Sequence, residues 1–210
     1  MFTIQNFRRA AMALVLAACS SLAAAAGTLT VELDTSGYGS NGWIDISLAH
    51  APTGVVATYA DIGNFVNFGS SDGAELYNVT GSLDSGFRIE NVYGAYNDLF
   101  HAVNYGSGKI SFSVSFSGDA DPSGLFGSLL SVALYGADRT TLLGDSSSID
   151  GALLHLNWTP SATVGGQGSI TSDVLGSGVT VSAVPEAETW AMMLGGLALM
   201  GLVRRRQQRR

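Results

Sequence analysis

Apolar and polar residues alternate most regularly in the segment 109–117. Ile110, Phe112, Val114 and Phe116 are apolar, and a serine follows each of them. Successive side chains of a β-strand point to opposite faces of a sheet, so this alternation predicts a strand with one face in a core and the other lined by serine hydroxyls.

Shorter runs with the same strand-like character recur along the middle of the chain. They lie at 29–33, 43–48, 55–60, 75–79, 87–92, 99–105, 130–135, 153–158 and 179–184. Clusters of Gly, Asn, Asp and Ser separate these runs and supply turns. The segment 165–178 is expected to form a loose hairpin. Short strands at regular spacing, without a helical period between them, predict an all-β fold, a single β-sandwich or jelly roll.

The first 26 residues have a different character. Arg8 and Arg9 precede an apolar run, and a stretch of small residues ends at Ala26. This order predicts a secretory signal peptide that signal peptidase cleaves between Ala26 and Gly27. Residues 16–19, Leu-Ala-Ala-Cys, also fit a lipoprotein box, in which Cys19 would carry the lipid. Both alternatives place the domain outside the cytoplasm.

The last 27 residues, 184–210, form a third segment. Pro185 and Glu186 precede an uncharged apolar run at 190–203, which begins with Trp190. A cluster of arginines follows, with Arg204, Arg205 and Arg206 at its start. An apolar helix that ends in arginines predicts a membrane span with a cytoplasmic tail. Fourteen residues give about 21 Å of helix, less than the roughly 30 Å bilayer core. A buried core helix is the alternative, which the arginines disfavour.

Pro185, Glu186, the short span and the terminal arginines together resemble the PEP-CTERM sorting signal of Gram-negative bacteria. The resemblance implies an exosortase as partner, a transient stay in the inner membrane, and delivery to the cell surface or the extracellular matrix. The chain departs from the motif at Ala187, where the family has a second proline. Residues 97–101, 109–117 and 130–136 resemble short uncharacterised PEP-CTERM surface proteins, a group that implies no reaction.

Between these two segments, residues 27–183 have the size of one domain. They contain three basic and fifteen acidic residues, a formal net charge of −12. Such a domain repels nucleic acid and anionic membranes. The carboxylates either keep an exported protein soluble or bind divalent cations. Because Cys19 is the only cysteine, cleavage after Ala26 leaves neither a disulfide nor a thiol nucleophile.

One acidic segment has the spacing of a calcium loop. Asp119, Asp121 and Ser123 place oxygen-bearing side chains at alternate positions before a glycine. The residue at the closing position of an EF-hand loop is Leu130, which cannot bind calcium. The sequence therefore leaves two interpretations, a hairpin turn and a calcium site of another kind. Asp145 and Asp150 bracket a second acidic loop, and no cofactor is otherwise expected.

Catalytic motifs are weak. Residues 69–73, Gly-Ser-Ser-Asp-Gly, match the nucleophile elbow of hydrolases, with Ser71 as the nucleophile. That elbow needs a helix after the serine, whereas a strand is expected there, so a hairpin loop is favoured. His50, His101 and His155 lack the spacing that brings two imidazoles to one metal. We therefore do not expect an enzyme.

Aromatic residues give one further lead, because exposed rings can stack against sugars. Tyr93 and Tyr96 lie in an expected loop and are candidate sugar contacts. For Trp43 and Trp158 core packing is favoured over sugar binding, because aromatic rings dominate sandwich cores. Tyr38 completes the set of candidates.

The leading hypothesis is an exported, exosortase-processed surface or matrix protein of a biofilm, with a non-catalytic structural β-domain. A carbohydrate-binding module that contacts exopolysaccharide is the alternative, followed by a secreted hydrolase.

Overall fold

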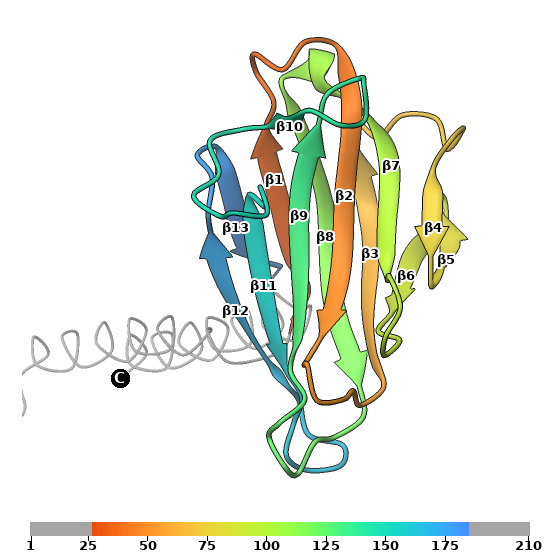
Figure 1. Cartoon of the computed structure of the whole chain (residues 1–210), viewed down its shortest axis with the longest axis vertical. Helices are drawn as coiled ribbons and strands as arrows, with labels where there is room; N and C mark the ends of the chain where they lie inside the picture. The colour runs from red at the N-terminus through yellow and green to blue at the C-terminus, as the bar shows by residue number, and fades with distance from the viewer. Residues whose placement is uncertain (1–26, 185–210) are drawn as a thin grey trace, which may run out of the picture.

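The computed structural model describes residues 27–184, and these form an all-β domain (Figure 1). A single turn of 3-10 helix, Tyr105–Ser107, accompanies the strands. The strands are β1 Leu29–Asp34, β2 Asn41–His50, β3 Thr58–Val66, β4 Glu75–Tyr77, β5 Val79–Ser82, β6 Gly86–Glu90, β7 Asp98–Asn104, β8 Lys109–Gly118, β9 Ser128–Tyr135, β10 Leu142–Leu143, β11 Leu154–Thr159, β12 Ser169–Val174 and β13 Val179–Ala183.

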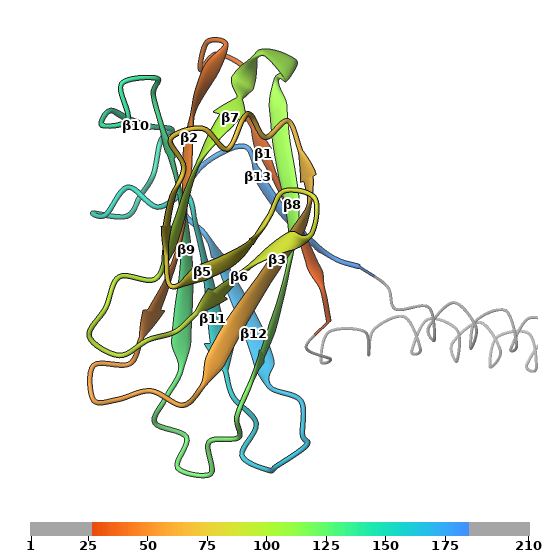
Figure 2. The ribbon, with the colours of Figure 1, turned by 90° about the vertical axis from the view of Figure 1, so that its right-hand side faces the viewer.

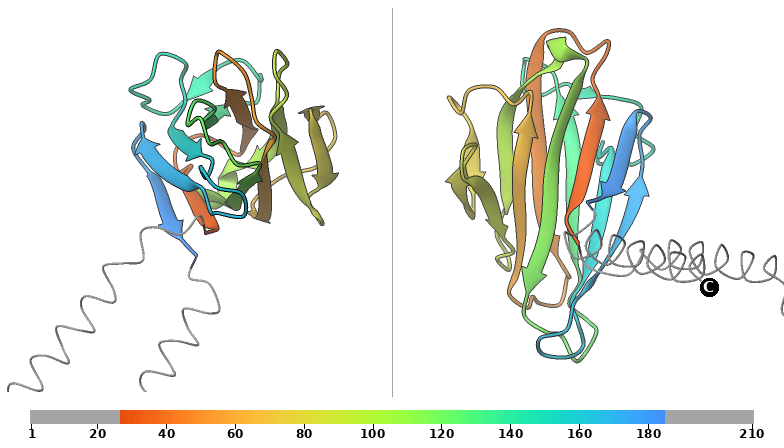
Figure 3. Two further views of the ribbon diagram at one scale, coloured as in Figure 1. Left: turned by 90° about the horizontal axis from the view of Figure 1, so that it is seen from below. Right: turned by 180° about the vertical axis from the view of Figure 1, so that it is seen from behind.

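The strands pair into two antiparallel sheets that lie face to face (Figure 2). Sheet A has the order β13-β1-β8-β3-β6-β5, and sheet B has the order β12-β11-β9-β2-β7-β4, with β10 paired to β9. Viewed from below, the two sheets form the two layers of a sandwich (Figure 3, left). The prediction of an all-β sandwich-like fold is therefore confirmed.

Strand β8 shows why the alternation produces this fold. Ile110, Phe112, Val114 and Phe116 are all buried between the sheets, at 0 to 7% exposure. They meet the inward residues of β2 and β9, such as Ile44 and Leu130, in one continuous hydrophobic core. The serines of β8 lie on the opposite, outer face of sheet A, where Ser113 and Ser115 line a groove described below.

The expected strands differ from the observed ones most clearly at three places, and the short strand β10 was not expected at all. The segment 75–79 is not one strand, because Asn78 adopts a left-handed φ of 53° and the chain passes there from β4 in sheet B to β5 in sheet A. The strand expected at 55–60 runs instead from Thr58 to Val66. The loose hairpin expected at 165–178 contains β12, an edge strand that pairs with β11. Its residues are mostly exposed, so they lack the apolar alternation that identifies half-buried strands.

The described chain begins and ends at one place on sheet A. Strand β1 pairs antiparallel with β13, so that Leu29 lies opposite Ala183. The backbone N–H of Val184 donates to the carbonyl oxygen of Thr28 at 2.8 Å. The view from behind shows the two strands side by side (Figure 3, right).

Several predictions concern residues outside the described range 27–184. These are the signal peptide with Ala26, the motif residues Pro185 and Glu186, and the helix 190–203 with Trp190 and the arginines that follow. Within 27–184 no helix has the length and hydropathy needed to cross a membrane.

Candidate functional site

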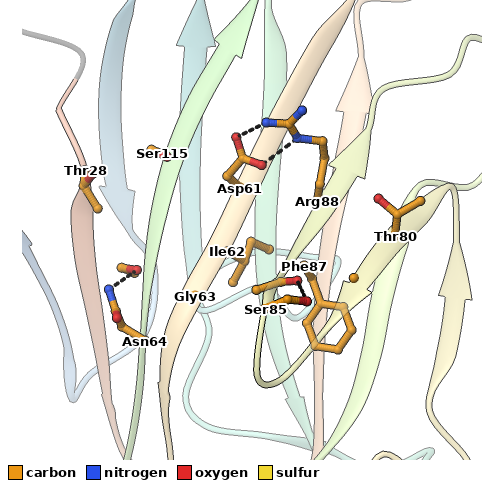
Figure 4. Close-up of a pocket in the computed structure, with 13 residues that line it drawn as sticks. Thr28, Asp61, Ile62, Gly63, Asn64, Thr80, Ser85, Phe87, Arg88 and Ser115 are labelled. Carbon is orange, nitrogen blue, oxygen red and sulfur yellow. Dashed lines mark hydrogen bonds and ion pairs between the residues drawn. The ribbon is translucent and has the colours of Figure 1, made fainter.

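A groove of about 510 Å³ lies on the outer face of sheet A (Figure 4). It crosses the sheet from Thr28, just before β1, to Thr80 on β5, and strands β8, β3 and β6 form its floor. Its lining is largely hydroxyl, amide and glycine: Thr28, Asp61, Ile62, Gly63, Asn64, Thr80, Gly81, Ser85, Gly86, Phe87, Arg88, Ser113 and Ser115.

Gly63 lies at the floor of this groove. A Cβ built on Gly63 would meet only the Ser113 hydroxyl, at 3.8 Å, which is an ordinary contact. The backbone of Gly63 does not have a left-handed φ. A side chain would therefore fit here without strain, so the glycine keeps the groove open and is not needed for the backbone conformation.

A β-bulge shapes the same part of the groove. The register between β3 and β8 shifts between Gly63 and Val66, and Asn64 within the bulge has a left-handed φ of 53°. The Asn64 amide donates from Nδ2 to Oγ of Ser113 at 3.0 Å. Bulges commonly re-aim a side chain, and this one turns an amide onto the outer face of the sheet.

An ion pair forms one wall. The Arg88 guanidinium donates from Nε to Oδ1 of Asp61 at 2.6 Å and from Nη2 to Oδ2 at 2.8 Å. These hydrogen bonds from Arg88 to Asp61 raise the pKa of Arg88 above its ordinary value. Arg88 also lies over the ring of Tyr59, 5.2 Å from its centroid. The described residues that line the groove therefore carry no net charge.

The structure brings Ser71 and His101 together. The Nδ1 atom of His101 lies 2.8 Å from the carbonyl oxygen of Ala102, which can only accept, so Nδ1 carries the proton. The other nitrogen, Nε2, then accepts from the Ser71 hydroxyl at 3.1 Å. His101 is fully buried on the inner face of β7, with Phe68 and Phe87 beside it. Sequence reasoning missed this pair, because thirty residues separate its members.

Ser71 nevertheless lacks the setting of a nucleophile elbow. Strand β4 follows its loop, where an elbow would have a helix. The Nδ1 proton of His101 goes to the backbone, so no carboxylate orients this imidazole as in a catalytic triad. The pair satisfies the hydrogen-bonding groups of a buried histidine.

The proposed calcium residues lie in the loop between β8 and β9. Asp121 is buried and acts as a turn cap: Oδ1 accepts from the backbone N–H and the hydroxyl of Ser123, and Oδ2 accepts from the N–H of Phe126 at 2.7 Å. The hydrogen bond from the Ser123 hydroxyl is the main cause that lowers the pKa of Asp121. Asp119 is exposed. Among residues 27–184 no three His, Cys, Asp or Glu side chains are grouped to hold a metal ion.

The candidate sugar contacts Tyr93 and Tyr96 lie in the loop between β6 and β7 and do not line the groove. Their exposed fractions are 55% and 83%. The ring of Tyr93 packs on His50 with 4.6 Å between centroids, and its hydroxyl donates to the carbonyl oxygen of Pro52. The Tyr93 ring is thus held against the domain. The Tyr96 ring is exposed, although the Tyr96 carbonyl oxygen accepts from the Asn78 amide at 2.9 Å.

The other candidate aromatic residues have structural contacts. Trp158 lies in the core, stacked on Phe116, and Tyr38 packs against the core. The expectation of core packing is wrong for Trp43, which lies on the outer face of sheet B and stacks on Phe100 with 5.1 Å between centroids.

Sheet B also holds a carboxylate that the sequence did not reveal. Asp45 lies on the outer face of β2, and its Oδ1 is buried without a hydrogen-bond partner among the described residues. Burial, and to a lesser extent the neighbouring Asp98, raises the pKa of Asp45 to about 7. A lone aspartate at an outward strand position gives no sequence signal, because the surrounding side chains that desolvate it come from other strands.

Comparison with known proteins identifies the C-terminal segment. No curated protein and no solved structure matches the chain. The family model of the PEP-CTERM protein-sorting motif matches residues 183–210. The match begins at Ala183, the last residue of β13. This chain therefore carries a PEP-CTERM protein-sorting motif, which implies export, processing by an exosortase and sorting to the cell surface.

Proposed function

We propose that the protein is an exosortase-processed component of the cell surface or extracellular matrix, and that its β-sandwich is a non-catalytic structural domain. The observation that carries the proposal is the sorting motif, whose match begins at the last residue of the last strand of the sandwich. In this proposal residues 1–26 are a signal peptide, and the helix 190–203 holds the precursor in the inner membrane until cleavage.

The arrangement of the sandwich suits a domain attached at one point. Strands β1 and β13 are neighbours in sheet A. The proposed signal peptide and the C-terminal sorting segment therefore join the domain at the same edge. The outer faces of both sheets then remain available outside the cell. The net charge of −12 keeps such a domain soluble and away from anionic membranes.

The role of the sandwich as a non-catalytic domain is supported by the contacts of its nucleophile candidate. The Ser71 hydroxyl donates to an imidazole that is itself fully buried between phenylalanines. A general base in acyl transfer has to return its proton to a leaving group that approaches it, and a fully buried imidazole is poorly placed for this.

The intact mass of the mature protein, recovered from the surface or medium of the native host, tests the proposal. A mass that begins at Gly27 and ends near Pro185 is expected. A double variant, Pro185→Ala with Glu186→Ala, should retain its C-terminal arginines and stay in the inner membrane. Normal release of this variant, or a lipid-modified Cys19 in the wild-type protein, would contradict the proposal.

Carbohydrate binding is the second candidate function, because Tyr96 presents an exposed ring beside Tyr93. Retention of the protein on matrix polysaccharide, lost in a Tyr93→Ala, Tyr96→Ala double variant, would support it.

A further inference from the structure

We infer that the groove on the outer face of sheet A binds a segment of an uncharged polysaccharide. The inference rests on the proposed export of the domain, which would bring the groove into contact with extracellular glycans. The binding site differs from the tyrosine loop, because neither Tyr93 nor Tyr96 lines the groove.

The shape of the groove favours a chain over a small molecule. Its lining comes from four neighbouring strands of sheet A, β8, β3, β6 and β5, and reaches from Thr28, just before β1, to Thr80 (Figure 4). A volume of about 510 Å³ is within the range of ligand sites in proteins. An extended polymer that lies across the strands would contact the whole length of the groove.

The polar groups of the groove match sugar hydroxyls. A hydroxyl side chain both donates and accepts, and so does each hydroxyl of a sugar. Among residues 27–184, no side-chain hydrogen bond engages the hydroxyls of Thr28, Thr80 or Ser115, although all three line the groove. The Asp61 carboxylate adds hydrogen-bond acceptors and the Arg88 guanidinium adds donors, and their pairing holds both groups in one plane.

The charges of the groove and of the surrounding domain favour an uncharged ligand. Among residues 27–184, Asp61 and Arg88 are the only charged residues that line the groove, and they neutralise each other. The surrounding domain carries a net charge of −12, which repels acidic polysaccharides. A protein partner fits less well, because interface cores are apolar and aromatic. Here the apolar lining residues Ile62 and Phe87 are buried, at 2% and 3% exposure.

Gly63 provides a second, independent observation. Glycine in the interior of a strand weakens the strand and commonly marks a place where a ligand approaches the backbone closely. The contacts of Gly63 would tolerate a side chain, so neither packing nor backbone geometry requires a glycine. Close approach of a ligand to the floor explains it.

The test is affinity electrophoresis of the full-length chain in detergent, with dextran, galactomannan or a mixed-linkage β-glucan in the gel and alginate as the anionic comparison. Gly63→Leu should fill the groove. Thr171→Leu is the matched control, because it adds the same side chain at an exposed position of β12 in sheet B. Thermal unfolding of each variant reports on folding.

We expect at least one uncharged polysaccharide to retard the wild-type protein, and alginate not to. Gly63→Leu should weaken the retardation about tenfold or more, equivalent to roughly 1.4 kcal/mol. Thr171→Leu and the Tyr93→Ala, Tyr96→Ala double variant should leave it unchanged. Retardation should also be insensitive to salt between about 50 and 500 mM, because screening acts on charges.

Absence of retardation by all three uncharged polysaccharides would overturn the inference, and so would retardation that only the tyrosine variant abolishes. If Gly63→Leu unfolds at a lower temperature than the wild type, a Thr80→Ala, Ser115→Ala double variant tests the inference instead. This variant only removes hydroxyls, and it should also weaken the retardation. Sorting is judged separately, by the mass of the mature protein, so either proposal can fail without the other.

Discussion

The hydroxyl of Ser71 donates to Nε2 of His101 across 3.1 Å and thereby completes the hydrogen bonds of an imidazole that is fully buried. The contact joins the loop between β3 and β4 to the inner face of β7. The loop is thus held against the core of the sandwich, where Phe68 also packs on the imidazole.

Replacing Ser71 by alanine should lower the free energy of unfolding by about 1–2 kcal/mol, because a buried nitrogen then loses its partner. Chemical denaturation measures this change. Ser70→Ala is the control, because the Ser70 hydroxyl only accepts from the exposed N–H of Asp72, and its effect should stay within about 0.5 kcal/mol. Equal stability of the wild type and Ser71→Ala would show that the contact contributes nothing. An esterase activity abolished by Ser71→Ala would contradict the proposed non-catalytic role.

Asp45 should make stability depend on pH. Its folded pKa of about 7 lies above the ordinary value of 3.8, so the native state holds a proton that the unfolded state releases between about pH 4 and 7. This carboxylate therefore destabilises the fold as pH rises through that window, by about 4 kcal/mol at most for a shift of this size. The charged groups around it include Asp98 of β7 and, through Asp98, Glu75 of β4.

Asp45→Asn should flatten the dependence of the melting temperature on pH between about 4 and 7 and raise the melting temperature at pH 8. Part of the dependence should remain, because burial also raises the pKa of Asp98. Asp84→Asn, at an exposed loop position, should change neither quantity. A wild-type protein whose stability does not fall from pH 5 to pH 8 would contradict the assignment.

Arg139 covers the aromatic pair on sheet B. Its guanidinium lies 4.2 Å from the ring centroid of Trp43 and 5.2 Å from that of Phe100, and it pairs with Glu75. Arg139→Ala should reduce stability by about 1 kcal/mol through the loss of the cation–π contacts. Exposure of Trp43 should also shift its fluorescence to longer wavelength.

Glu75→Gln is the matched variant, because it removes the ion pair and leaves the guanidinium over the rings. It should cost less than Arg139→Ala and leave the fluorescence in place, because an exposed ion pair contributes little. A fluorescence shift of equal size in both variants would mean that the ion pair, and not the stacking, holds Arg139.

Local pattern was sufficient for most of the fold. The alternation in β8 identified both its buried face and its serine face, because period 2 belongs to the strand itself. It failed at β12, whose side chains are mostly exposed, and at Asn78, where the chain changes sheets. An edge strand is held by backbone hydrogen bonds to its neighbour, and these leave no apolar period in the sequence.

The candidate sites divide in the same way. The signal peptide and the C-terminal sorting signal are each contiguous in the sequence, so residue order alone predicted them. The family match at 183–210 supports the sorting signal. Residues distant in the sequence form the groove and the Ser71–His101 contact. Residues distant in the sequence also form the surroundings that bury Asp45. Only the pairing of β3 with β8 and β6 brings Gly63, Ser113 and Arg88 to one surface. The sequence by itself determined the strand periods and the C-terminal sorting motif, which depend on neighbouring residues. The tertiary structure decided which polar side chains meet, because that depends on sheet order and register.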